Sequence, residues 1–333
     1  MALDRMALKR GWTVSGPQTE PVAVAHDAAP AVTASAGAEP PRRRGSLGPV
    51  GLVLAGCVSV QFGAALAVSL MPRAGAIGVV TLRLVVAAVV MLVVCRPKLR
   101  GHSRSDWGTV VAFGIAMGGM NLLFYQAAAR IPLGIAVTFE VLGPLALSVF
   151  ASRRLVNVLW AGLALCGVFL LGGAGDGLGG LNLAGVGFAV AAGACWATYI
   201  IFSARTGRRF PQADGLALAM VVAAVLCLPL GIATAGPKLI DPVTLGLGAA
   251  VAIMSSVLPY TLELVALRRL PASTFAVMMS LEPAVAALSG FLVLSQDLAW
   301  SEVLAITLVI AASMGAVRTQ VGRKKDPAVA LHE

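Results

Sequence analysis

Long apolar stretches alternate with short polar breaks along most of this chain, from residue 48 to residue 317. A helix needs about 20 residues to cross a hydrocarbon core of about 30 Å, and the apolar stretches have that length. They predict ten transmembrane helices, at residues 48–70, 76–95, 107–128, 133–151, 155–172, 181–204, 214–234, 243–267, 272–293 and 300–317.

The stretches are expected to be helices rather than strands of a barrel. Inside a bilayer every backbone amide must be bonded within the protein, which leaves helices and closed barrels. Barrel strands alternate apolar and polar residues over about ten positions, and these stretches do not alternate. Asp106, Asp214 and Glu302 stand at predicted helix starts, where an acid suits the positive end of the helix dipole. The pattern therefore predicts an all-α integral membrane protein.

The composition supports the same class. Hydrophobic residues make up 58% of the chain and charged residues 12%, whereas soluble domains contain about 25% charged residues. The net charge of +10 does not indicate a nucleic-acid partner, because the basic residues stand in short clusters between the apolar stretches. The lipid bilayer is the partner that this composition predicts.

The basic clusters also predict the orientation in the membrane. Lys and Arg gather in alternate breaks, whereas the other breaks hold only Arg73, Arg130 and Lys238. Because cytoplasmic loops are enriched in Lys and Arg, both termini are expected on the cytoplasmic side of a bacterial inner membrane. Residues 1–46 are expected to be a disordered cytoplasmic tail, and residues 318–333 a second cytoplasmic tail.

Two parts of the chain, 130–154 and 269–292, repeat one another. Three pairs of residues align: Arg130 with Arg269, Pro132 with Pro271, and Pro144 with Pro283. The fourth predicted helix thus corresponds to the ninth, which implies two five-helix halves, 47–172 and 181–317, crossing the membrane in opposite senses. Such inverted repeats are typical of secondary transporters, with a substrate site near the middle of the membrane.

Pro144 and Pro283 lie inside their predicted helices. A proline in a helix interior removes a backbone hydrogen bond and weakens the helix. We interpret the pair as helix breaks beside a substrate site; ordinary tolerated kinks are the alternative.

Several strings resemble one known family. They are GGMNLLFY (118–125), PLGIAVTFEVLGPLALSVFASRR (132–154), GACWATYI (193–200), SSVLPYTLELVALRRLP (255–271) and FAVMMSLEPAVAALSG (275–290). With the repeat, they resemble the EamA branch of the drug/metabolite transporter superfamily, and within it the amino-acid exporters of the threonine and homoserine type, over residues 48–317. The resemblance implies export of small neutral amino acids across the inner membrane by alternating access, coupled to protons.

Four ionisable residues lie inside the predicted helices: Arg83, Glu140, Glu263 and Glu282. A charge at the centre of a membrane helix costs about 2.5–3.5 kcal/mol on insertion scales, so such residues usually face a cavity or a partner. Glu140 and Glu282 lie on repeat-related helices and could face one pocket. There a carboxylate binds the substrate's ammonium group or carries the coupling proton; a hydrogen bond between helices is the alternative. Arg83 could bind a substrate carboxylate, pair with Glu140 or extend to the membrane surface.

Polar stripes on three other helix faces could complete a route for a hydroxy amino acid. Packing between helices is an equal interpretation of each. The stripes consist of Ser256, Tyr260 and Glu263, of Asn121 and Tyr125, and of Trp196, Tyr199 and Ser203.

The sequence predicts no catalytic, metal-binding or cofactor-binding residue. The five cysteines form no C-x-x-C pair, and the three histidines lie outside the apolar stretches. The sequence therefore offers no catalytic constellation for a membrane-embedded enzyme. A broad-specificity drug or metabolite effluxer of the same fold is the alternative function, and the oligomeric state is left open.

Overall fold

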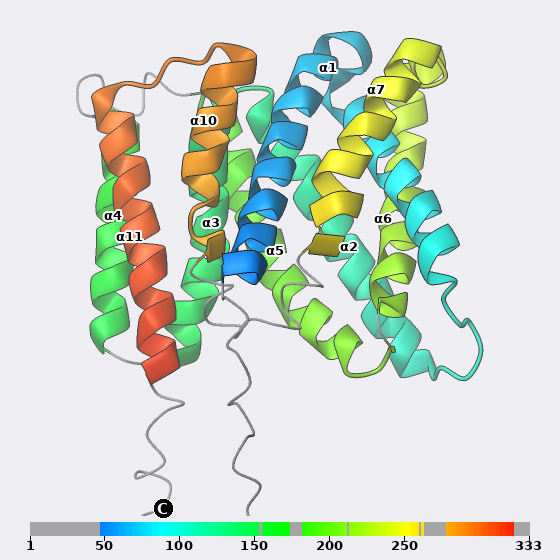
Figure 1. Cartoon of the computed structure of the whole chain (residues 1–333), viewed down its shortest axis with the longest axis horizontal. Helices are drawn as coiled ribbons and strands as arrows, with labels where there is room; N and C mark the ends of the chain where they lie inside the picture. Colours follow the sequence, from blue (N-terminus) through cyan, green and yellow to red (C-terminus); the bar gives the residue numbers. More distant parts are fainter. Residues whose placement is uncertain are drawn as a thin grey trace, which may run out of the picture. The chain divides into compact units, whose positions relative to one another are not determined.

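The structure, a computed structural model, describes residues 47–152, 155–173, 182–211, 213–259, 261–262 and 278–322. These residues form helices without strands, so the prediction of an all-α protein is confirmed. The elements are α1 (Leu47–Cys95), α2 (Arg104–Ala128), α3 (Leu133–Ser152), α4 (Leu155–Gly173), α5 (Leu183–Gly207), α6 (Asp214–Ala235), η2 (Gly236–Leu239), α7 (Pro242–Ala252), η3 (Ile253–Val257), α10 (Glu282–Leu294) and α11 (Trp300–Gly322) (Figure 1). The tail predicted at residues 1–46 lies outside the described residues, and α11 continues past the predicted helix end at residue 317.

Helix α1 consists of two arms that meet at Gly75. Gly75 has φ 70° and ψ 164°, a conformation that only glycine adopts readily. The sequence predicts a break across residues 71–75, but the chain stays helical through Pro72 and only Gly75 departs from helical geometry. The break is therefore shorter than predicted, because one glycine is enough to redirect the backbone.

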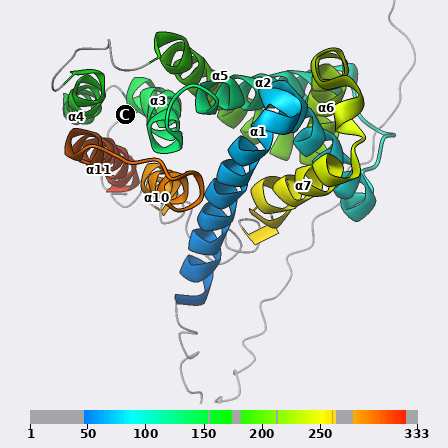
Figure 2. The ribbon, with the colours of Figure 1, turned by 90° about the horizontal axis from the view of Figure 1, so that it is seen from above.

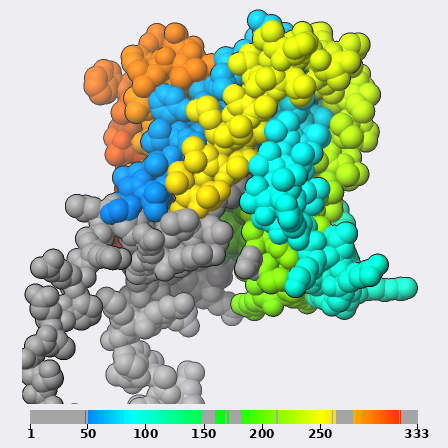
Figure 3. All heavy atoms as spheres, turned by 45° about the vertical axis from the view of Figure 1, so that its right-hand side comes forward, coloured from blue at the N-terminus to red at the C-terminus, as the bar shows by residue number. Residues whose placement is uncertain are grey.

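The first arm of α1 lies between two groups of helices (Figure 2). On one side α3, α4, α10 and α11 pack against each other, and on the other side α2 packs against α5 and α6. Helix α7 packs against α1, and Figure 3 shows it between the two arms. Contact between α3 and α5 joins the two groups.

The helices are apolar enough for a membrane. Four segments are long and apolar enough to cross one: Val50–Cys95, Arg104–Ala128, Leu183–Gly207 and Asp214–Leu239. Shorter apolar helices cover Leu133–Leu147, Pro242–Val257, Glu282–Leu294 and Trp300–Ala316. Large apolar side chains such as Val93, Val94 and Leu159 are more than half exposed, which suits contact with lipid.

A close contact between two glycines joins α3 to α5. A Cβ atom added to Gly143 would collide with the Gly193 carbonyl, and one added to Gly193 would lie 2.5 Å from the Glu140 carbonyl oxygen. Small residues allow such an approach of membrane helices. Pro144 lacks the N–H that would bond the Glu140 carbonyl, yet α3 continues through Pro144. The carbonyl that Pro144 leaves unbonded within α3 thus lies against the backbone of α5.

Two predicted helices are irregular in the structure. The stretch expected as one helix at 243–267 contains the π-helical segment η3 directly after α7. The stretch expected at 272–293 has a turn at Ser280 and Leu281, and α10 starts at Glu282. Pro283 therefore stands in the first turn of α10, where its missing N–H leaves no bond unmade, rather than inside a continuous helix.

The Gly143–Gly193 contact predicts a position-specific effect of added volume on α5. Gly193→Ala should destabilise the protein by about 1–3 kcal/mol, because the methyl group overpacks the contact. Gly187→Ala on the same helix is the matched control, since no atom lies near its added Cβ. Melting temperatures of the purified proteins in detergent measure the difference, and equal melting of the two variants would contradict the prediction.

Candidate functional site

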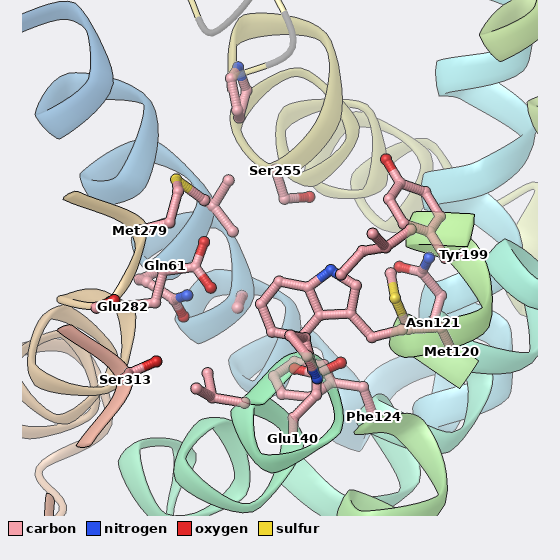
Figure 4. A pocket seen from close by; sticks show the side chains of 18 of the residues that line it. Gln61, Met120, Asn121, Phe124, Glu140, Tyr199, Ser255, Met279, Glu282 and Ser313 are labelled. Atoms are coloured by element: carbon pink, nitrogen blue, oxygen red, sulfur yellow. The ribbon is translucent and has the colours of Figure 1, made fainter. Parts of the chain in front are cut away.

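One cavity lies where the two groups of helices meet. It has a volume of about 590 Å³ and is lined by residues from α1, α2, α3, α5, α10 and α11 and from η3. Figure 4 shows polar and aromatic side chains around it. Eight residues selected from the sequence line this cavity: Arg83, Asn121, Glu140, Pro144, Trp196, Tyr199, Ser203 and Glu282.

Arg83 of α1 is buried beside the cavity, with 9% of its surface exposed. Its guanidinium donates from Nη1 to the Tyr125 hydroxyl at 2.9 Å, from Nη2 to the Ser255 carbonyl at 2.9 Å, and from Nε to Ser256 Oγ at 3.2 Å. The Tyr125 ring also lies 5.5 Å from the Arg83 guanidinium carbon. The side chain is therefore held inside the protein and does not extend to the membrane surface.

The π-helical segment η3 explains why Arg83 finds a backbone acceptor there. A π-helical turn replaces the usual i→i+4 bonds with i→i+5 bonds, as in the bond from the Leu258 N–H to the Ile253 carbonyl. The Ser59 hydroxyl of α1 donates to the Met254 carbonyl at 2.6 Å, and Arg83 donates to the next carbonyl, that of Ser255. Side chains of α1 thus bond successive carbonyls of η3.

Two acids reach the cavity from different helices, Glu140 from α3 and Glu282 from α10 (Figure 4). Both are buried. Among the described residues, no hydrogen bond or ion pair of the Glu140 carboxyl group is found, and Arg83 lines the same cavity. Glu282 is the first residue of α10, where the helix dipole favours a carboxylate. The two acids, which lie in the two repeated parts of the sequence, therefore line one cavity.

The polar stripes on α2 and α5 are only partly directed at the cavity. Trp196, Tyr199 and Ser203 of α5 all line it. On α2, Asn121 lines it and donates to the Met117 carbonyl at 2.9 Å, whereas Tyr125 is buried beside Arg83.

Other residues selected from the sequence have different positions. Pro144 lines the cavity, and Pro283 is buried in the first turn of α10. Tyr260 and Glu263 lie outside the described residues.

The structure adds residues that the sequence analysis missed, above all Gln61 of the first arm of α1. Gln61 lines the cavity with 3% of its surface exposed, and its Oε1 atom has no hydrogen-bond partner within the described part of the chain. Met120, Phe124 and Ser313 also line the cavity. The available signal for Gln61 is a polar residue in the middle of the first apolar stretch, but its neutral amide is not one of the ionisable groups that mark the predicted site.

The arrangement suits a small molecule with charged groups. It offers one guanidinium, two carboxyl groups, amides and hydroxyls within walls that are otherwise apolar or aromatic. Within the described residues no group of three or more His, Cys, Asp or Glu is arranged to hold a metal ion.

Comparisons with known proteins agree with the predicted resemblance. Residues 183–318 match the EamA-like transporter family. The Threonine/homoserine exporter RhtA of Salmonella typhimurium (strain LT2) and that of Escherichia coli (strain K12) are each 41% identical to this chain over 271 residues, which cover 81% of this chain and 92% of each exporter. A crystal structure with 19% sequence identity gives a TM-score of 0.55 and covers 82% of this chain and 98% of that one, which indicates a shared fold. Because the match to the two exporters extends over most of both chains, this protein is a membrane transporter that belongs to the EamA-like transporter family.

Proposed function

We propose that this protein exports threonine, homoserine and similar small neutral amino acids across the bacterial inner membrane. The observation that carries the proposal is the 41% sequence identity to two proteins named as threonine/homoserine exporters, over 92% of the length of each. The similarity extends over nearly the whole length of each exporter.

The cavity supports an amino acid as the substrate. An amino acid carries an ammonium group and a carboxylate, and the cavity offers buried groups of both charges, Arg83, Glu140 and Glu282. Asn121 and Tyr199 offer polar groups to the side chain of a hydroxy amino acid. Tyr260 and Glu263 stay in the proposed site on the sequence pattern alone.

The proposed architecture is ten transmembrane helices in two inverted halves, 47–172 and 181–317, with tails at 1–46 and 318–333. The family match at 183–318 agrees closely with the second half. The Gly75 break, which divides α1 into two arms, supports the count of ten. The distribution of Lys and Arg supports cytoplasmic termini.

Transport is proposed to be secondary and coupled to protons, by alternating access at the cavity. One acid then binds the substrate's ammonium group and another carries the proton. Glu140 and Glu282, on repeat-related helices, are the acids proposed for the two tasks.

A broad-specificity effluxer of the same fold is the second candidate. Met120, Phe124, Trp196 and Met279 give the cavity large apolar and aromatic contacts, and flexible Met-rich walls adapt to varied ligands. A substrate panel separates the two candidates, because such a pump moves apolar dyes as readily as amino acids.

Proteoliposomes test the function directly. Vesicles loaded with radiolabelled threonine should lose it faster with the protein than without it, and a proton gradient should raise the rate further. Homoserine should compete with threonine, whereas lysine and apolar dyes should not. Threonine loss equal to that of loaded vesicles without the protein would contradict amino-acid export. A rate that the proton gradient leaves unchanged would contradict proton coupling but not amino-acid export.

Neutral replacements of the two acids test the site. Glu140→Gln and Glu282→Gln should each lower threonine transport by about tenfold or more, because each removes a charged hydrogen-bonding group from the cavity. Glu302→Gln makes the same change at the start of α11, away from the cavity lining, and should transport normally. Membrane abundance of each variant is measured in parallel; transport at the parental rate by both cavity variants would show that the site is wrongly assigned.

A further inference from the structure

Arg83 has an unusual environment for a buried cation. A charge inside a membrane protein normally pairs with an opposite charge or faces water. The three acceptors that Arg83 contacts, from Tyr125, Ser255 and Ser256, are all neutral. Within the described residues the one ion pair joins Arg209 to Asp106, far along the chain from this position. The positive charge of Arg83 is thus oriented by neighbours but not neutralised by a bonded acid.

The Arg83 guanidinium also has N–H groups that these three hydrogen bonds do not use. It carries five N–H groups, and three of them are used in the bonds to α2 and η3. Because Arg83 lines the cavity, the two remaining N–H groups are available to a ligand there. A guanidinium binds carboxylates through paired N–H donors, with a geometry that a lysine ammonium lacks.

Glu140 supplies a carboxyl group to the same cavity, and the two side chains form no ion pair. A ligand in this cavity that carries both charges would place its anionic group on Arg83 and its cationic group on Glu140. A ligand with only one charge would leave one of the two buried groups without a partner.

We propose that Arg83 binds the α-carboxylate of the exported amino acid while Glu140 binds its ammonium group, so that the protein selects zwitterions. This inference rests on the proposed export of small amino acids and specifies how they are recognised. Arg83 sets the specificity for a free carboxylate, and Tyr125, Ser255 and Ser256 fix the guanidinium in position before the substrate arrives.

Threoninamide provides the test, because it keeps the shape and the ammonium group of threonine and replaces the carboxylate with a neutral amide. In proteoliposomes containing the wild-type protein, unlabelled threonine should inhibit radiolabelled threonine transport at a concentration at least about tenfold lower than threoninamide, since the amide leaves the guanidinium without an anionic partner. Arg83→Met should raise the KM for threonine and abolish this preference. Arg83→Lys, which keeps the charge and loses the paired donors, should retain a reduced preference.

Arg205→Met is the matched control, because Arg205 is exposed on α5 and contacts Phe202 rather than the cavity. It should keep both the KM and the preference. Equal inhibition by threonine and threoninamide in the wild-type protein would overturn the inference, as would an Arg83→Met variant that keeps the preference. The wild-type competition needs no variant to fold, and threonine transport without any preference would refute the inference while leaving amino-acid export intact.

Discussion

The structure depends on hydrogen bonds that polar side chains of α1 make inside the apolar region. Arg83 shows this most clearly, because its guanidinium bonds the Tyr125 hydroxyl on α2 and the backbone of η3 at the same time. Ser59 adds a second bond from α1 to η3. Where water is absent an unbonded backbone carbonyl is costly, so the irregular turn after α7 is stable only against these side chains of α1. The cavity lies beside this set of bonds.

Glu140 and Glu282 supply the two carboxyl groups of the cavity. The two acids come from helices that the internal repeat relates. The local backbone differs, because one acid lies within a helix and the other begins one. Glu140 lies in a continuous α3, beside the glycine contact with α5. Glu282 starts α10 after a turn. Two inverted halves would place such irregular backbone around a central site, as the proposed function requires.

Much of the fold could be predicted because lipid sets the length of apolar helices. The cavity shared by Glu140 and Glu282 could be predicted because the two acids lie on repeat-related helices and a buried charge usually faces a cavity or a partner. Details that depend on packing could not be predicted. The break that the apolar pattern predicts across residues 71–75 occurs only at Gly75. The π-helical turn has no distinct apolar pattern. Gln61 was missed because a neutral amide gives no charge signal, and Arg83 had three interpretations that only its bonding partners distinguish.

A structure determined with threonine bound tests the central claim most directly. The account predicts density for the amino acid within the cavity, with its carboxylate on the Arg83 guanidinium and its ammonium group toward Glu140. Threonine bound at saturating concentration anywhere outside this cavity, or within it in the reverse orientation, would contradict the account.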